Sequence, residues 1–467
     1  MTLTIARKEA TEMARDGRFR WAVGIVLVLL LGSLVAGWTH YASAEAERAT
    51  AQASDREVWL GQGEKNQHSA THFGAYAFKP TTPLTAADPG VLPYTGTSVF
   101  MEAHSGADAD FRPAEDATTV QRLGSLTAAS TLQLLVPLLI LLLAFSAFAG
   151  ERDAGTLRQL LSLGVPRKRL ALGKALGVAS PILLLVVPLA VVGVAALALL
   201  DGPGSPLATL GRASMLVGVY VAYFVLVLAL SLLVSAWAGS SRTALVTLLG
   251  FWLVTSFVVP RVAVSAADAL HPTPTLTAFE ESWRAEREAL PPWPDRVAEI
   301  EERLMEEQGV DTPDAITASV SGVALYEAER DETDLRRPLY AALGEQYETQ
   351  TQTAQAVSIL SPLLAVQLVS MGLAGSDHAH HRHFADAAEA YRYDYVQALN
   401  QDMIDENADW SFTVGREMWE EVPPFTYQTP SASWAVGRYG LSLGVLGAWT
   451  LALLVALPIA AGRLRAA

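Results

Sequence analysis

Six long apolar stretches, separated by polar segments, dominate the hydrophobic pattern of this chain. None of them contains Asp, Glu or Lys. A helix rises about 1.5 Å per residue, so about 20 apolar residues are needed to cross the apolar core of a bilayer. We therefore predict an all-α polytopic membrane protein with six transmembrane helices. The predicted spans cover residues 21–38, 131–149, 177–200, 213–238, 243–260 and 434–461.

The first span has two interpretations. Trp21 and Trp38 bracket it as interfacial anchors of a true span would. A cleaved signal peptide is the alternative, because residues 42–44 (Ala-Ser-Ala) resemble a cleavage site. The preceding segment, residues 1–20, carries both acidic and basic residues and reads as an amphipathic lead-in helix. These features favour an uncleaved span.

Two large polar inserts follow the first and fifth spans. Insert 1 (residues 39–130) is rich in Gly, Pro, Thr and Ala, with candidate strands at 75–78 and 97–100. Insert 2 (residues 261–433) reads as mainly helical. Its predicted helices cover 279–290, 295–308, a long segment that starts at Thr312-Pro313, and 377–408.

One apolar segment of insert 2 is too short to be a seventh span. Residues 361–375 (SPLLAVQLVSMGLAG) number only 15, fewer than a bilayer crossing needs. The segment either lies at or dips into the outer leaflet as a membrane-surface helix, or packs within the extracytoplasmic domain. The sequence supports both interpretations equally.

The distribution of charge sets the predicted orientation. Segments that share a side with the N-terminus carry 14 basic residues (Lys and Arg) and five acidic ones. Insert 1 carries 6 basic and 11 acidic residues, and insert 2 carries 11 basic and 31 acidic residues. Basic residues near the spans mark the cytoplasmic side. We therefore expect a bacterial inner-membrane protein with both termini in the cytoplasm and both inserts outside it.

Composition excludes several classes of function. The chain has no cysteine, which rules out disulfides and thiolate sites, and its net charge of -15 argues against a nucleic-acid partner. It lacks the phosphate-binding pattern G-x-x-x-x-G-K-[ST], as well as H-E-x-x-H and G-x-S-x-G. We expect no enzyme activity and no cofactor in this chain itself.

The most informative motif lies in the predicted cytoplasmic loop, residues 150–176. Thr156 and Gln159 form a T-x-x-Q capping-box pattern that predicts a short helix. Helical spacing places three leucines on one face of it, and Gly164 with Pro166 ends it. A basic run then leads into the third span. The expected contact residues of this loop are Glu151, Gly155, Thr156, Leu157, Leu160, Leu161, Arg167, Arg169 and Lys174.

This loop resembles that of ABC-2-type transporter permeases, in which E-R/K-x-x-G-T-L-x-x-L-L-x-x-P-x-x-R followed by G-K recurs. Pro166 lies one or two positions later than in that pattern. The six spans and the lead-in before the first are similar too. The long inserts resemble a subgroup with an enlarged extracytoplasmic domain, related to the smaller permease of nitrous-oxide reductase maturation.

The resemblance implies a function and a set of partners. The loop would be a coupling helix that docks on separate ABC ATPase subunits, which would hold ATP and Mg. The chain would be the permease of an exporter, as a homodimer or paired with a second permease, in contact with membrane lipid. The alternative is a non-transporting mechanotransducing or assembly-factor complex driven by the same ATPase, whose acidic domain binds a periplasmic protein.

Two groups of histidines are candidate metal ligands. His378, His380, His381 and His383 lie within six residues and could hold a borderline metal such as Zn, Cu or Ni. The simpler interpretation is a polar helix start near the membrane, so we expect no metal there. His68 and His72 have i, i+4 spacing, but the Gly and polar residues around them do not suggest a helix.

Overall fold

The computed structural model describes residues 1–104, 109–110, 112–115, 117, 126–199 and 206–464. Within this part of the chain, six helices are long and apolar enough to cross a membrane. The prediction of an all-α polytopic protein with six spans is therefore confirmed. The spanning helices cover Phe19–Leu60, Ala128–Asp153, Arg167–Ala195, Pro206–Trp237, Ser241–Leu270 and Gly440–Gly462.

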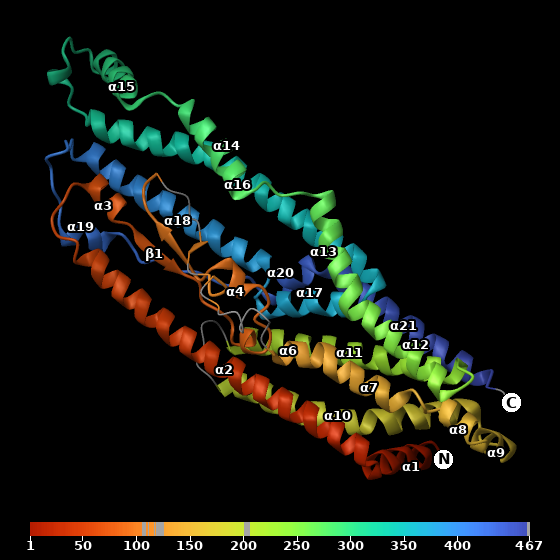
Figure 1. The fold of residues 1–467 in the computed structure, drawn as a ribbon. Helices are drawn as coiled ribbons and strands as arrows, with labels where there is room; N and C mark the ends of the chain where they lie inside the picture. The colour runs from red at the N-terminus through yellow and green to blue at the C-terminus, as the bar shows by residue number, and fades with distance from the viewer. Residues whose placement is uncertain (105–108, 111, 116, 118–125, 200–205, 465–467) are drawn as a thin grey trace.

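The molecule is elongated, with a helical bundle at one end and a second domain at the other (Figure 1). The N-terminus and the end of α21 (Gly440–Gly462) lie at the free end of the bundle, beside the short helices α1 (Thr2–Arg15), α8 (Ala149–Asp153) and α9 (Thr156–Ser162). We call this the terminus-bearing end. The elements beyond the bundle, from residues 39–126 and 271–433 apart from α17, form the distal domain.

Several spans are less regular than the sequence indicates. The second and fifth contain π-helical turns, and a break at Tyr439 separates α20 (Ala432–Arg438) from the sixth span. Pro181 and Pro188 lie inside one continuous helix. The spans consist of α2 (Gly17–Leu60), α6 (Ala128–Ser130) with η2 (Thr131–Leu135) and α7 (Val136–Ala144), α10 (Arg167–Leu199), α11 (Pro206–Trp237), α12 (Ser241–Leu253) with η3 (Val254–Val258) and α13 (Val259–Leu270), and α21 (Gly440–Gly462).

The distal domain combines long helices with a small antiparallel sheet, and the two candidate strands of insert 1 are confirmed. The sheet order is β1 (Ala75–Phe78), β2 (Ser98–Met101) and β3 (Ala109–Asp110), with Ala75 opposite Met101. The helical elements are α3 (Gln67–Phe73), η1 (Pro83–Ala86), α4 (Leu92–Thr95), α14 (Leu276–Glu288), α15 (Trp293–Gln308), η4 (Pro313–Ala315), α16 (Val320–Val357), η5 (Ser358–Leu360), α18 (His378–Asp405) and α19 (Arg416–Glu421).

The helix of the first span continues past Trp38, because α2 is a single helix of 44 residues that reaches the distal domain. One helix prediction in this region was wrong. Pro313 starts only the short turn η4, and the long helix α16 begins after Ser319, whose side chain caps it. Pro338 lies inside α16 without ending it. Packing against α13 and α18 offsets the hydrogen bond that this proline lacks.

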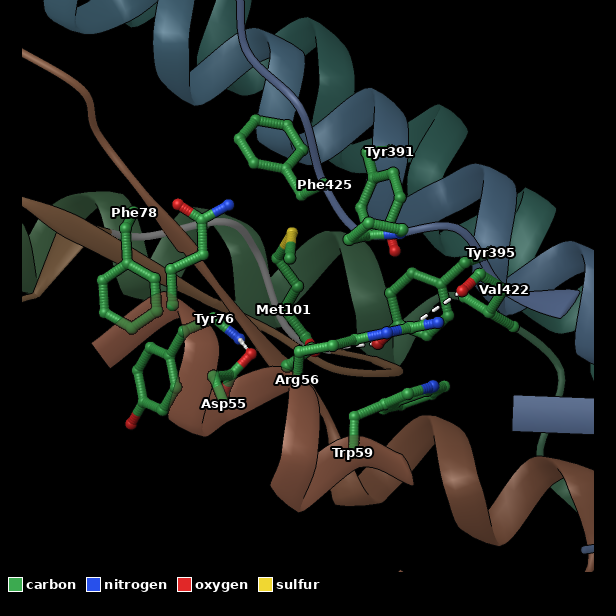
Figure 2. A pocket seen from close by; sticks show the side chains of 13 residues that line it. Asp55, Arg56, Trp59, Tyr76, Phe78, Met101, Tyr391, Tyr395, Val422 and Phe425 are labelled. Carbon is green, nitrogen blue, oxygen red and sulfur yellow. Dashed lines mark hydrogen bonds between the residues drawn. The ribbon is translucent and has the colours of Figure 1, made fainter. Parts of the chain in front are cut away.

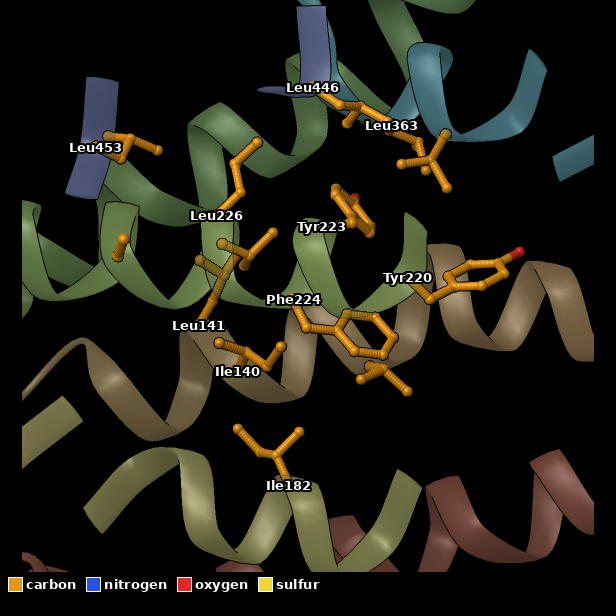
Figure 3. Packing of buried hydrophobic residues seen from close by; sticks show 14 of the residues in the cluster. Ile140, Leu141, Ile182, Tyr220, Tyr223, Phe224, Leu226, Leu363, Leu446 and Leu453 are labelled. Carbon is orange, nitrogen blue, oxygen red and sulfur yellow. The ribbon is translucent and has the colours of Figure 1, made fainter. Parts of the chain in front are cut away.

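The bundle and the distal domain have separate hydrophobic cores. Figure 3 shows the bundle core, in which Ile140 and Leu141 of α7 meet Phe224 of α11 and Ile182 of α10. The distal core packs Trp59 of α2 and Phe384 of α18 with the sheet and Trp419. Because α2 contributes to both cores, it connects the two ends of the molecule mechanically.

The short apolar segment 361–375 forms a helix buried among the spans. It is α17 (Pro362–Ala374), which contacts α11 and α21, and nearly all its residues are buried in the bundle core. Arg212 of α11 donates to the carbonyl oxygens of Gly372 (3.3 Å) and Leu373 (2.9 Å) at its end. It therefore does not lie on the membrane surface: protein side chains cover it on most sides.

Candidate functional site

The loop after the second span folds as the two short helices α8 and α9, but its local geometry differs from the predicted one. Gly155, with φ of +70°, precedes α9 as its N-cap and makes no side-chain cap. The capping box of Thr156 and Gln159 was therefore wrong. Thr156 lies inside the first turn, and its hydroxyl donates to the carboxylate and to the carbonyl oxygen of Glu151. The left-handed backbone at position 155 explains why glycine is needed there.

The leucine face of α9 points into the protein. Leu157 is 1% exposed within the bundle core, and Leu160 and Leu161 pack partly buried against the same core. The opposite face and the tip of the hairpin are open to the outside. Leu163 is 79% exposed, next to Gly164 with its φ of +76°. The exposed residues of this surface are Arg158, Gln159, Ser162 and Leu163.

Lys174 joins three elements through buried ion pairs. Its Nζ lies 2.7 Å from Glu9 Oε1 of α1 and 3.1 Å from Glu151 Oε1 of α8. The Lys174 side chain is 2% exposed and the two carboxylates 12% and 13%. Lys8 adds a further contact, 3.6 Å from Glu151. A buried lysine with two carboxylates holds α1, α8 and α10 together because separating them would strand a desolvated charge.

Two glycines let α1 cross α10 at close range. A Cβ at Gly173 would lie 2.7 Å from the Ile5 side chain, and one at Gly177 would lie 2.5 Å from Glu9 Cβ. Any larger side chain at these positions would push α1 away. The Gly-Lys pair of the sequence motif therefore has two roles in the fold. Gly173 leaves room for α1 to lie on α10, and Lys174 forms an ion pair with Glu9 of α1.

The α8–α9 hairpin is also fixed to the remaining helices at this end. Arg152 of α8 donates to the carbonyl oxygens of Ala236 (3.0 Å) and Ala238 at the end of α11. Asp153 accepts from the main-chain nitrogen of Ser241 at 3.0 Å, at the start of α12. Arg167 donates to the Leu464 carbonyl oxygen at 3.1 Å, whereas Arg169 is exposed. Movement of the hairpin would thus reach several spans.

A family comparison agrees with this architecture. The family model of the ABC-2 family transporter proteins matches residues 3–457. The chain belongs to the ABC-2 family. It is accordingly a multi-pass membrane protein and the permease component of an ABC transporter. No curated protein matches the chain.

The ion pairs of Lys174 show what sequence reasoning missed at this site. The motif residues of the loop were found, but their partner Glu9 was not. Its signal was weak, because Glu9 is one of three acids in the amphipathic lead-in, with Glu12 and Asp16. Leu157 and Lys174, expected as partner contacts, are buried in this chain and face other parts of it.

The four clustered histidines start α18 but point to different neighbours. Asp377 caps the helix and contacts Nδ1 of His380, which in turn approaches Arg212. His383 Nδ1 lies 3.0 Å from the Tyr427 hydroxyl, and the His378 ring contacts the Tyr347 ring at a tilt of 52°. In the described part of the chain, no three of these histidines bring their ring nitrogens together as a metal site requires.

Lys79 is a buried amine close to this histidine cluster. It is 4% exposed, and its Nζ has no hydrogen-bond partner among the described residues. Burial lowers the pKa of Lys79 to about 8, although the charge of Asp377 opposes that shift. Burial and the nearby Lys79 also lower the pKa of His381 to about 3. Burial therefore favours the uncharged forms of Lys79 and His381.

An aromatic seam joins α2, the sheet and α18 in the distal domain (Figure 2). Arg56 donates to the Val422 carbonyl oxygen at 2.9 Å, and Tyr395 donates to that of Met101 at 2.8 Å. The pocket between these side chains has a volume of about 40 Å³. That space suits one or two water molecules. These aromatic residues therefore pack α2, the sheet and α18 together and do not form a ligand-binding pocket.

Proposed function

We propose that this chain is the permease of an ATP-driven exporter that couples to separate ATPase subunits through the α8–α9 hairpin. The observation that carries the proposal is the division of α9 into two faces. Leu157 is sealed inside the chain, while Leu163 projects from the tip, 79% exposed. An apolar residue held outward by a rigid hairpin is suited to fill a groove on a partner.

The ion pairs around Lys174 make the hairpin a mechanical lever. Because α8 is fixed to α1, α10 and the α11–α12 turn and leads directly into α9, a force on the tip of the hairpin would move these helices as a unit. ATP and Mg would bind the partner subunits, and their closure would favour one of two arrangements of the spans. A second permease, either identical or homologous, would complete the transporter.

The experiment that tests this proposal exchanges the exposed leucine. Leu163→Asp places a charge in the expected groove, where burying a leucine is worth about 1.5–3 kcal/mol. We expect at least a tenfold loss of the ATP hydrolysis that co-purifies with the tagged permease from its native membranes. Leu276→Asp is the matched control, since Leu276 is 73% exposed but lies in the distal domain. Full ATP hydrolysis with Leu163→Asp would show that the tip is not the docking point.

The orientation belongs to the same proposal. The basic residues of the terminus-bearing end support a cytoplasmic location of both termini in a bacterial inner membrane, with the acidic distal domain outside. A reporter inserted between Leu163 and Gly164 should read as cytoplasmic. One inserted in the turn at Gly309 should read as extracytoplasmic. The reverse result at either position would refute the orientation.

A second function, mechanical transduction without transport, is favoured by α2. This helix runs unbroken from the terminus-bearing end to Trp59 in the distal core. The cavity lined by Tyr223 and Trp252 within the bundle measures only about 10 Å³, which is too small to hold a substrate. A transducer would move the distal domain in response to ATP.

The absence of native cysteine makes this alternative directly measurable. Spin labels at Ser54→Cys on α2 and Ser282→Cys on α14 report the distance across the distal domain. Transduction predicts an ATP-dependent change that Ala51→Pro, which interrupts α2, abolishes. An unchanged distance together with ATP-dependent export would favour the transporter.

A further inference from the structure

Three histidines from two separate segments meet on the distal domain. His68 and His72 are one turn apart on α3, and His104 follows β2. One ring nitrogen of each lies within 4.8 Å of the others. The prediction that residues 68–72 do not form a helix was wrong. Asn66 caps α3 by accepting from the His68 main-chain nitrogen at 2.9 Å.

The contacts of His68 determine which of its nitrogens is available. Its Nδ1 lies 3.2 Å from Asn400 Oδ1, and the amide nitrogen of Asn400 donates to Gln397 at 3.4 Å. An amide oxygen can only accept, so His68 Nδ1 carries the proton and Nε2 presents a lone pair. That Nε2 lies 3.2 Å from His72 Nε2. Two imidazole nitrogens therefore face each other across a gap suited to a shared proton or a shared cation.

Residues of α16 contact His104 and fix its position. Its Nδ1 lies 3.6 Å from Glu329 Oε2 and 3.4 Å from Glu332 Oε2, both on α16. Its carbonyl oxygen accepts from Arg336 at 3.1 Å, and its backbone φ is +61°. A carboxylate behind an imidazole orients the ring and makes it a better metal ligand. The uncommon backbone angle places the ring beside the other two histidines.

The spacing of the nitrogens fits a metal ion with imidazole ligands. Zinc binds histidine nitrogen at about 2.0–2.1 Å, so two ligands at the tetrahedral angle lie about 3.3 Å apart. The His68–His72 separation of 3.2 Å agrees with this value. The largest separation, at most 4.8 Å, closes with small rotations of the rings. Three imidazoles without a thiolate suit Zn²⁺, Co²⁺, Ni²⁺ or Cu²⁺.

The site can be reached from outside through His72 and His104. His72 is exposed, His104 is half-buried and His68 is buried. His104 also lines a cavity of about 470 Å³ together with Glu332 and Trp410. Three protein ligands leave a fourth coordination position for water or for another molecule.

We propose that His68, His72 and His104 form a binding site for a divalent metal ion of the zinc class on the distal domain, with a fourth position open to a ligand. The site does not depend on ATPase coupling, since its residues lie at the opposite end of the molecule from α9 (Figure 1). In the absence of metal, His72 would donate its proton to His68. The cluster would then be an ordinary hydrogen-bonded pair beside His104.

The test uses the full chain in detergent, purified through a tag without histidine and stripped of metal with a chelator. We expect about one Zn²⁺ per chain after dialysis, as for a site with three protein ligands. Co²⁺ should give the intense visible absorption of a four-coordinate nitrogen site. Zn²⁺ should raise the Tm of the wild-type chain, because an ion that binds only the folded state stabilises it.

His72→Gln is the main variant because this exposed side chain can be changed with little effect on folding. It should weaken zinc binding at least tenfold, and the double variant with His104→Gln should lose the ion and the Co²⁺ spectrum. His383→Gln, an exposed histidine of the α18 cluster, is the matched control and should bind as wild type does. Failure of the wild type to bind Zn²⁺, or unchanged zinc content in the double variant, would overturn the proposal.

Discussion

Lys174 Nζ lies 2.7 Å from Glu9 Oε1, although 165 positions separate the two residues in the chain. The contact places the amphipathic helix α1 directly on the start of the third span. The same ammonium group also holds Glu151 in the loop before α9. A residue that the family pattern presents as part of a docking loop is therefore the internal link between three elements.

Removing this ammonium group should release α1. Lys174→Met leaves Glu9 and Glu151 with only the more distant and exposed Lys8 as a cation, 3.8 Å and 3.6 Å away, and losing one member of a buried pair costs about 3–5 kcal/mol. Glu9→Gln should cost less, since Glu151 remains. The combined variant should be less destabilised than the sum of the two. Tm values of the four proteins in detergent provide the measurement, and strictly additive effects would mean that the pair contributes nothing.

The glycines under α1 offer an independent test of the same contact. Gly177→Val would place side-chain atoms where Glu9 Cβ lies, 2.5 Å from the position of the new Cβ. We expect faster amide hydrogen exchange throughout Thr2–Arg15, because α1 can no longer lie on α10. Gly193→Val is the matched control, since a Cβ at Gly193 has no atom within 4 Å. Equal exchange rates in the two variants would contradict the close crossing.

The two faces of α9 should respond differently to truncation. Leu157→Ala opens a cavity in the bundle core, where such a change costs about 2–5 kcal/mol. Trypsin should then cleave faster at Arg158 and Arg167, which are exposed on the hairpin. Leu163→Ala should leave the cleavage rate unchanged, because its side chain is open to the outside. Rapid cleavage of both variants would indicate that the hairpin lacks an inner face.

Stability should depend on pH through Lys79. The pKa of this lysine falls to about 8 in the folded protein, whereas an unfolded chain has a lysine pKa of about 10.4. Between these values the unfolded state holds the extra proton, so the free energy of unfolding rises with pH. The full effect is at most about 3 kcal/mol, and it is complete near pH 10.5.

The variant Lys79→Met isolates this contribution. It removes a buried amine that has no hydrogen-bond partner among the described residues, so its Tm at pH 7.5 should exceed that of the wild type. The difference should shrink between pH 8 and pH 10, as the wild-type lysine loses its proton. A difference that stays constant over this window would show that Lys79 titrates normally.

Local patterns in the sequence were sufficient for much of the fold. The six spans follow from apolar length, and the strand at Ala75–Phe78 follows from its residue types. The end of α15 follows from Gly309, whose φ of +66° suits glycine. Each of these features depends on neighbours within a few residues, which is the range that periodicity and capping rules describe.

The candidate site was only partly predictable. The pattern around Gly155 and Lys174 located the hairpin, but it assigned Lys174 and Leu157 to an outside partner. A local sequence pattern does not distinguish a leucine face that packs within its own chain from one that binds a partner protein. Glu9 was missed for the same reason, because an ion pair is visible only when both partners are placed in space.

By itself the sequence determined which segments are apolar enough to enter the membrane and which loop carries the ABC-2 pattern. The tertiary structure alone decided that α17 is buried between α11 and α21, that α2 continues into the distal domain, and that His104 meets His68 and His72. The physical reason is that the first group depends on transfer free energies and backbone preferences that add along the chain. The second depends on contacts between distant residues, which form only when packing brings their helices together.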